Sequence, residues 1–296
     1  MCVAGGVAAA RNGSTVMVSH DPVLHCADHA GVRTLTLNRP HRKNAIDAEL
    51  WAALQDVLRA TATDLDVRVV VLTGAGGEFC SGADISTPDN THPAYRMRAL
   101  TEVALALHEL PMPTVAKVRG VAVGAGWNLA LGCDFVVATP QARFSQIFAR
   151  RGLSPDLGGT WLLPKIAGLQ QAKRLALLGE TIDGEQAREL NLVTWLCDDA
   201  ELDGFVDDLA ARLAAGPPVA LAQTKALLNE GADRSLREAL AGEARAQGIN
   251  FATADAPEAF AAFADKRPPR FTGRWTVTRP PIRRADRPDD EGRTDA

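Results

Sequence analysis

Cysteine pairs that could form a disulfide framework are missing from this sequence. Its five cysteines lie far apart, form no C-x-x-C pair and leave one residue unpaired in any disulfide scheme. Disulfides persist mainly in oxidising compartments, so this cysteine usage favours a reducing, cytoplasmic setting. The five residues are Cys2, Cys26, Cys80, Cys133 and Cys197.

Concentrated positive charge and long apolar runs are also missing. The formal net charge is −4 at pH 7, whereas a nucleic acid or an anionic membrane selects a concentrated basic surface. No run is long and apolar enough to span a bilayer, and residues 1–11 lack the basic start of a signal peptide. We therefore expect no nucleic-acid partner, no membrane partner and no export.

Two classes of cofactor site are absent as well. No group of histidines and cysteines has the spacing of metal ligands. The glycine-rich turns lack the order of lysine and hydroxyl residues that a nucleotide-binding P-loop requires. We expect neither a metal nor a nucleoside triphosphate.

The chain does contain enough apolar sequence for a large core, with 296 residues of which 46% are hydrophobic. A segment from Val23 and a second one over residues 32–37 predict a hairpin, and Asp47 predicts the N-cap of a helix to Ala62. Further strands are expected at 67–72, 114–118 and 133–138, with helices over 100–110 and from about residue 126. Strands that alternate with helices indicate an α/β fold.

Beyond Gly179 the pattern becomes wholly helical, with glycine or proline at most joins. The expected helices cover residues 184–190, 202–215, 217–229, 235–250 and 257–266. We divide the chain into an N-terminal extension (1–19), an α/β core (20–200), a C-terminal helical region (201–272) and a tail (273–296) whose Arg, Asp and Pro content predicts disorder.

Two segments share one design, in which a buried strand leads through small residues into a helix. The first runs through Gly82 to Ala83, and the second through Gly124 to Ala125. Small residues let a ligand approach the main chain, and free amides at a helix start favour a developing negative charge. If the turns face each other, the N–H groups of Ala83 and Ala125 form an oxyanion hole. Taken alone, each turn is better explained by simple chain reversal.

Several motifs follow one another in a fixed order. On these motifs, the sequence from about Val32 to Phe271 resembles the crotonase (enoyl-CoA hydratase/isomerase) superfamily. The motifs are N-R-P (38–40), N-A-I (44–46), L-T-G (72–74), F-C-S-G-A-D (79–84), P-T-V-A-K-V-R-G (113–120), G-A-G-W-N-L-A-L-G-C-D (124–134), F-S-Q (144–146), G-L-S-P-D-L-G-G-T-W-L-L-P (152–164) and A-F-A-D-K-R (262–267).

The resemblance implies a fold of stacked ββα units followed by helices that assemble trimers or dimers of trimers. Ala83 and Ala125 match the two oxyanion-hole amides, and residues 86–98 match part of a lid over the acyl pocket. An acyl-CoA thioester is then the expected partner, with coenzyme A as part of the substrate and no separate cofactor. The matched coenzyme A positions are Ala45, Asp84, Ile85, Phe263 and Lys266, the last two from a neighbouring subunit in many relatives.

The departures from the family pattern bear on the chemistry. Hydratases of this family use two glutamates, where this chain has Asn128 and Phe148. An amide and a phenyl ring cannot exchange protons at neutral pH, so the pair that adds water is missing. Asn128 and Phe148 are therefore expected to contact the substrate without moving its proton. Asn128 could equally cap or pack in its own helix.

One carboxylate, Asp156, stands at the start of a predicted helix. Spacing alone favours an N-cap, which stabilises a helix by roughly 1 kcal/mol. The resemblance favours catalysis, because some isomerases of the superfamily carry an aspartate here and dehalogenating members use one as a nucleophile. Residues 152–168 look most like the isomerases that act on the ring epoxide of phenylacetyl-CoA. A wall of Phe148, Trp127 and Trp161 would keep such a site dry and raise the pKa of the base.

Three functions follow as hypotheses. The first is an enoyl-CoA isomerase in which Asp156 shuttles a proton while Ala83 and Ala125 hold the enolate oxygen. The second is an enoyl-CoA hydratase in the broad family sense, in which Asp156 alone would activate water. The third is an acyl-CoA binding protein with little turnover.

Overall fold

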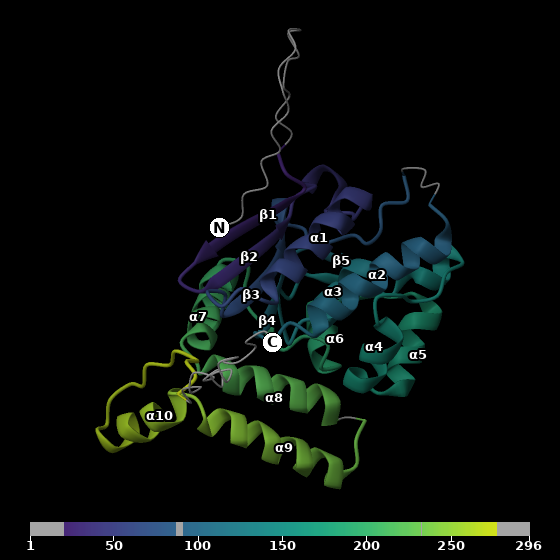
Figure 1. Cartoon of the computed structure of the whole chain (residues 1–296). Helices are drawn as coiled ribbons and strands as arrows, with labels where there is room; N and C mark the ends of the chain where they lie inside the picture. Colours follow the sequence, from purple (N-terminus) through teal and green to yellow (C-terminus); the bar gives the residue numbers. More distant parts are fainter. Residues whose placement is uncertain (1–20, 87–90, 232, 277–296) are drawn as a thin grey trace, which may run out of the picture.

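A mixed sheet of six strands forms the centre of the molecule in the computed structural model, which describes residues 21–86, 91–231 and 233–276 (Figure 1). The strand order is β1-β2-β3-β4-β6-β9. The first pair is an antiparallel hairpin, and the remaining strands join in parallel. Their bounds are β1 Leu24–His29, β2 Val32–Leu37, β3 Val69–Gly74, β4 Thr114–Val118, β6 Phe135–Ala138 and β9 Trp195–Leu196.

The apolar run of β3 explains why this strand is central. Val70 and Leu72 point into the larger core cluster, while Val69 and Val71 point into the second cluster on the other face. A strand covered on both faces needs apolar residues at every position, which is the pattern that predicted it. Helix α7 (Leu202–Ala214) covers the second face, and α1 (Ala48–Thr61), α2 (Pro93–His108) and α3 (Ala125–Leu131) cover the first.

A smaller sheet continues from β4 and carries the chain toward the candidate site. Its order is β5-β7-β8, with β5 parallel to β7 and β8 antiparallel to it. The bounds are β5 Val121–Val123, β7 Arg143–Ser145 and β8 Thr181–Asp183. Strands β8 and β9 lie beyond Gly179, so the expectation of a wholly helical second half was wrong. Each has only two or three residues, too few to display a period of two.

The remaining elements connect and cover the sheets. The predicted helix after Asp47 is present, and the Asp47 side chain accepts a hydrogen bond from the Leu50 amide at 3.0 Å. Within the described residues, short 3₁₀ helices occur at η1 Pro40–Arg42, η2 Ala75–Gly77 and η3 Ile147–Arg151. The other helices before α7 are α4 Gly159–Ala167, α5 Leu169–Leu178 and α6 Gly184–Glu189.

Helices α8 (Pro218–Gly231), α9 (Leu236–Phe251) and α10 (Asp255–Ala264) form an arm beside the core (Figure 1). The chain returns after α10, and a bridge joins Thr253 to Trp275. Residues 273–276, which we assigned to the tail, are therefore held on the arm. The N-terminal extension and the tail from residue 277 lie outside the described residues. Large apolar side chains of the arm are exposed, namely Leu228, Leu236, Leu240, Phe251, Phe260 and Phe263.

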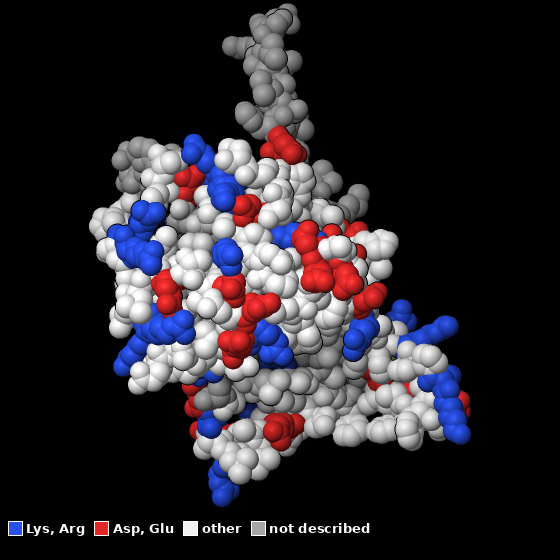
Figure 2. Space-filling view, turned by 180° about the vertical axis from the view of Figure 1, so that it is seen from behind, with Lys and Arg blue, Asp and Glu red and all other residues white. Residues whose placement is uncertain are grey.

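Acidic and basic side chains are interspersed on the face seen in Figure 2, with no continuous basic stripe among the residues coloured there. Part of this charge is paired: Arg119 lies 2.7 Å from Asp199 and 2.9 Å from Asp203, linking β4's end to α7. Over the ranges that the structure describes, no helix has the length and apolar content that crossing a bilayer requires.

Candidate active site

The first glycine-rich turn is held between two other segments. Cys80 pairs with Ala122 of β5, with its amide 2.8 Å from the Val121 oxygen. On the other side, the Ile46 amide donates to the Gly82 oxygen at 2.8 Å, and the Asp84 amide donates to the Ile46 oxygen at 2.9 Å. In a parallel bridge of this kind, the residue between the Gly82 oxygen and the Asp84 amide directs its own N–H away from Ile46. Ala83 is that residue.

The second turn ends at Gly124, whose φ of +55° favours glycine, and α3 begins at Ala125. The first amides of a helix have no partner within it. A Cβ at Gly82 would lie 2.8 Å from the Val123 oxygen and 3.7 Å from the Ala125 nitrogen, so the two turns are in contact. Ala83 and Ala125 each follow the paired residues Cys80 and Ala122 by three positions. Among the described residues, neither alanine amide donates a hydrogen bond.

Phe148 in η3 lies against the second turn. Its ring atoms are 3.7 and 3.8 Å from the position of a Cβ at Gly124, and 6% of the residue is exposed. The ring therefore forms an apolar wall beside the start of α3. It offers no group that could take up or release a proton.

Asn128 lies one turn along α3 and is only 1% exposed. Its Oδ1 accepts a hydrogen bond from Gln146 Nε2 at 2.8 Å, and its Nδ2 donates to the main-chain oxygen of Asp156 at 2.9 Å. We predicted a substrate contact for Asn128. The structure uses both ends of this amide to join three parts of the protein.

Asp156 is not the N-cap of α4, so that alternative was wrong. The helix begins at Gly159 with Gly158 as its N-cap, and the intervening Leu157 and Gly158 have φ values of +47° and +78°. This left-handed bend separates the Asp156 carboxylate from the first amides of α4. Its Oδ1 atom is buried and has no hydrogen-bond partner among the described residues.

Burial raises the pKa of Asp156 to about 6, because a carboxylate loses its hydration. A hydrogen bond within Asp156 and the positive charge of Arg96 on α2 both oppose this shift. A carboxyl with a pKa close to neutral pH is suited to accept and return a proton.

Two of the three aromatic residues proposed as a dry wall lie elsewhere. Trp127 is fully buried in the core and packs on Phe144, with ring centres 5.4 Å apart. Trp161 is 40% exposed and packs on His108, with Lys165 Nζ 4.5 Å from its ring centre. Of the three, Phe148 alone lies beside the glycine turn.

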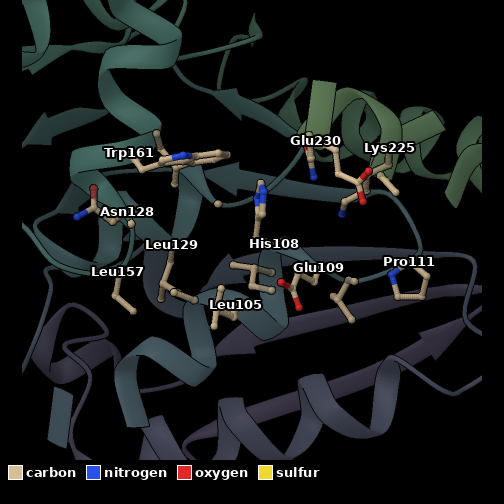
Figure 3. Close-up of a pocket in the computed structure, with 18 of the residues that line it drawn as sticks. Leu105, His108, Glu109, Pro111, Asn128, Leu129, Leu157, Trp161, Lys225 and Glu230 are labelled. Atoms are coloured by element: carbon tan, nitrogen blue, oxygen red, sulfur yellow. The ribbon is translucent and has the colours of Figure 1, made fainter. Parts of the chain in front are cut away.

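A cavity of about 720 Å³ lies behind this region, between α2, α3, α4 and α8 (Figure 3). Leu105, Leu129 and Leu157 line one end, and Lys225 and Glu230 line the other. The described residues that line it include Asn128 but not Ala83, Ala125 or Asp156. The cavity therefore shares a wall with the candidate site without containing its polar groups.

The predicted coenzyme A positions fall in two separate places. Ala45, Asp84 and Ile85 lie along the first turn, where Ile85 is exposed. The Asp84 side chain accepts a hydrogen bond from Ser86 Oγ at 2.6 Å and lies 2.9 Å from Arg39. The hydrogen bonds from Ser86, followed by the one from Arg39, lower the pKa of Asp84 to about 2.

Phe263 lies in the last turn of α10 and Lys266 lies two residues beyond its end, on the arm. Phe263 is 88% exposed, and α10 packs against α9 instead of against the glycine turns. A single chain does not bring this pair to the candidate site. Of the lid segment, residues 87–90 lie outside the described residues and 93–98 begin α2.

Sequence reasoning missed three residues that shape the site. Gln146 holds Asn128, Arg96 faces Asp156, and Arg39 joins Asp47 to Asp84 at 3.0 and 2.9 Å. Gln146 was visible in the F-S-Q motif just before Phe148, but no local pattern pairs it with Asn128. The two lie in different elements, 18 residues apart.

Comparisons with known proteins agree with the fold described above. Residues 27–274 match the family described as Enoyl-CoA hydratase/isomerase. The chain is 40% identical over 251 residues to 1,2-epoxyphenylacetyl-CoA isomerase of Escherichia coli K12, which covers 82% of this chain and 96% of that protein. It is 33% identical over 240 residues to short-chain-enoyl-CoA hydratase of Clostridium acetobutylicum, covering 80% and 92%. A solved enoyl-CoA hydratase of Bacillus anthracis superposes with a TM-score of 0.80 at 30% identity, covering 85% and 99%.

Proposed function

From the premise that this chain belongs to the enoyl-CoA hydratase/isomerase family and has its crotonase-like α/β fold with C-terminal helices, we propose that it moves a proton between two carbons of an enoyl-CoA thioester. The observation that carries the proposal is the Asp156 carboxyl. It is partly buried, has an oxygen without a partner among the described residues, and has a pKa raised to about 6. Asn128 and Phe148, at the positions of the two family glutamates, cannot exchange a proton at neutral pH.

The reaction needs one base and one oxyanion site. Asp156 as the carboxylate takes a proton from the α-carbon of a 3-enoyl thioester, or from the γ-carbon of a 2-enoyl thioester, and the electron pair moves to the thioester oxygen. The N–H groups of Ala83 and Ala125 stabilise this enolate oxygen. Protonated Asp156 then returns the proton to a different carbon while the double bond re-forms, so no water and no redox partner is consumed.

Coenzyme A enters only as part of the substrate. Ala45, Asp84 and Ile85 line its path along the first turn, and Phe263 and Lys266 of a neighbouring copy complete it. The exposed apolar side chains on α8, α9 and α10 support self-association into a trimer or a dimer of trimers, because such surfaces are rare on monomers. Phe148 borders the acyl group beside Gly124.

Hydration is the second candidate, since the relatives from C. acetobutylicum and B. anthracis carry that name. It would require Asp156 alone to activate water and to manage the carbon proton. The absence of a second titratable group at Asn128 and Phe148 makes proton transfer the better supported reaction.

The test is mass spectrometry of 2-enoyl- and 3-enoyl-CoA thioesters incubated with the protein in D2O. We expect deuterium incorporation or double-bond migration in the wild type, and its loss in Asp156→Asn. The matched control is Asp208→Asn, which changes an exposed aspartate on α7. Addition of water would establish a hydratase, and tight acyl-CoA binding without any exchange would establish a binding protein. Full turnover by Asp156→Asn would refute the role of Asp156.

A further inference from the structure

We propose that Gln146 and Asn128 are positioning residues, which fix Asp156 relative to the oxyanion turn by holding its main-chain carbonyl. We call the chain of hydrogen bonds from Gln146 Nε2 to Asn128 Oδ1, and from Asn128 Nδ2 to the Asp156 oxygen, the amide relay. This inference rests on the proposed function, because it assumes that Asp156 is the group that moves the proton.

The amide relay is anchored to the same turn that supplies the second oxyanion amide. The main-chain N–H of Asn128 donates to the Gly124 oxygen at 3.0 Å, and the main-chain N–H of Gly124 donates to the Ser145 oxygen at 2.8 Å. Gln146 directly follows Ser145. Asn128 is therefore joined through its main chain to Gly124, at the end of the second turn, and through its side chain to Asp156. The Asp156 oxygen also accepts from the Gly159 amide at 2.9 Å, and Asn128 is the donor that ties it to the oxyanion turn.

Burial holds the hydrogen bonds of the relay in one arrangement. Gln146 is fully buried and Asn128 is nearly so, and a buried amide that loses its partner keeps the cost of its lost hydration. The two side chains therefore have strong reason to keep their hydrogen bonds to each other and to the Asp156 carbonyl.

Gly159 leaves room for the relay. A Cβ at this position would lie 2.5 Å from Asn128 Nδ2 and 2.8 Å from its Oδ1. Any larger residue would push the Asn128 amide away from Asp156. Gly159 is thus required by its close approach to Asn128. Its own φ is not positive, so its backbone conformation does not require glycine.

The relay matters because an aspartate just before a helix has an alternative role. Its carboxylate commonly accepts hydrogen bonds from the first amides of that helix, which lowers its pKa. Here α4 is capped by Gly158 without any side-chain bond. The Gly159 amide donates to the Asp156 oxygen and the Trp161 amide to the Gly158 oxygen, both at 2.9 Å, so among the described residues the Thr160 amide is the one left for a displaced carboxylate. Holding the Asp156 carbonyl, together with the bend at Leu157 and Gly158, keeps the carboxylate away from this amide.

Arg96 on α2 is the charged group that faces Asp156 from a packed element, and it also favours the ionised form. A displaced Asp156 would lose burial, gain a helix amide and keep this positive charge. The loss of burial and the gain of a helix amide each lower the pKa of the carboxyl. The base would then be both weaker and misplaced.

The experiment compares Asn128→Leu and Gly159→Ala with Ser145→Ala. The first variant removes the side-chain amide at similar volume, and the second displaces that amide while removing no polar group. Ser145 Oγ is buried and donates to the Gly179 oxygen at 3.2 Å, so Ser145→Ala removes a neighbouring buried hydrogen bond outside the relay. All proteins are used as full chains in the assembly they form.

Two readouts separate the relay from the proposed function. The first is the titration of the Asp156 carboxyl carbon by ¹³C NMR, assigned by its absence in Asp156→Asn. The second is the pH profile of proton exchange. We expect the carboxyl to titrate well below pH 6 in both relay variants, the acidic limb of kcat to move with it, and kcat to fall about 100-fold with little change in KM. Ser145→Ala should match the wild type in both.

The relay is refuted if either folded relay variant keeps the wild-type titration and kcat, or if Ser145→Ala shifts them equally. Should Asn128→Leu fail to fold, Gly159→Ala decides alone. If the wild type exchanges no proton, the proposed function fails, yet the carbon titration still reports whether the relay holds Asp156.

Discussion

Replacing Asp156 by asparagine should stabilise the folded protein at neutral pH while it removes proton transfer. The unfolded carboxyl titrates near its ordinary pKa of 3.8 and the folded one at about 6. Between these values the folded state binds the additional proton, so stability falls as the pH rises through this window and stays lower above it. The ionised Asp156 carboxylate therefore lowers the free energy of unfolding at pH 8.

The size of this effect follows from the shift. About two pKa units at 1.36 kcal/mol each give about 3 kcal/mol as an upper bound. Solvent reaches part of the side chain, so we expect Asp156→Asn to gain about 1–3 kcal/mol at pH 8. At pH 4 most of the gain should disappear, because the wild-type carboxyl is then protonated in the folded state.

Urea unfolding followed by circular dichroism at pH 8 and pH 4, at one protein concentration, measures both quantities. Asp84→Asn is the matched control of opposite sign. The pKa of the wild-type Asp84 carboxyl is lowered to about 2, so its charge contributes stability above pH 3.8 that is lost as the pH falls toward 2. We expect Asp84→Asn to be less stable than the wild type at pH 8. An Asp156→Asn protein that is no more stable at pH 8, or equally more stable at both pH values, would contradict the burial argument.

Two further predictions concern the glycine turns and the arm. Gly126→Ala should lower kcat and destabilise the fold by about 1–3 kcal/mol, because the new Cβ would lie 2.4 Å from the Cys80 oxygen and force the turns apart. A thermal melt and an exchange assay measure this, and unchanged values would mean that the turns can separate freely. Lys266→Ala should weaken acyl-CoA binding, which titration calorimetry measures. If Lys266 acts on a neighbouring copy, a mixture of Lys266→Ala and Asp156→Asn chains should regain activity. No recovery in the mixture would place Lys266 in the site of its own chain.

Local patterns predicted the elements that are buried on two faces or capped by a side chain. Strand β3 was predictable because every one of its first four residues is apolar, and α1 because Asp47 accepts from the Leu50 amide. Strands β8 and β9 were not, because two or three residues carry no period. Both are defined by pairing with distant strands instead of by their own sequence.

The candidate site was predictable only in part, for similar reasons. Spacing favoured Asp156 as a cap, but the left-handed Leu157 and Gly158 turn it away, and such conformations are rare for leucine. The partners of Asn128 come from two other segments, which no helical period specifies. Trp127 was expected at a site wall, but its helix turns it into the core.

The pairing of Cys80 with Ala122 also limits how the length of this chain can vary. Because Ala83 and Ala125 stand three residues beyond that pair, an insertion or deletion in one turn alone would carry its amide out of step with the other. The two turns are therefore coupled in length, and a viable length change in one requires a matching change in the other.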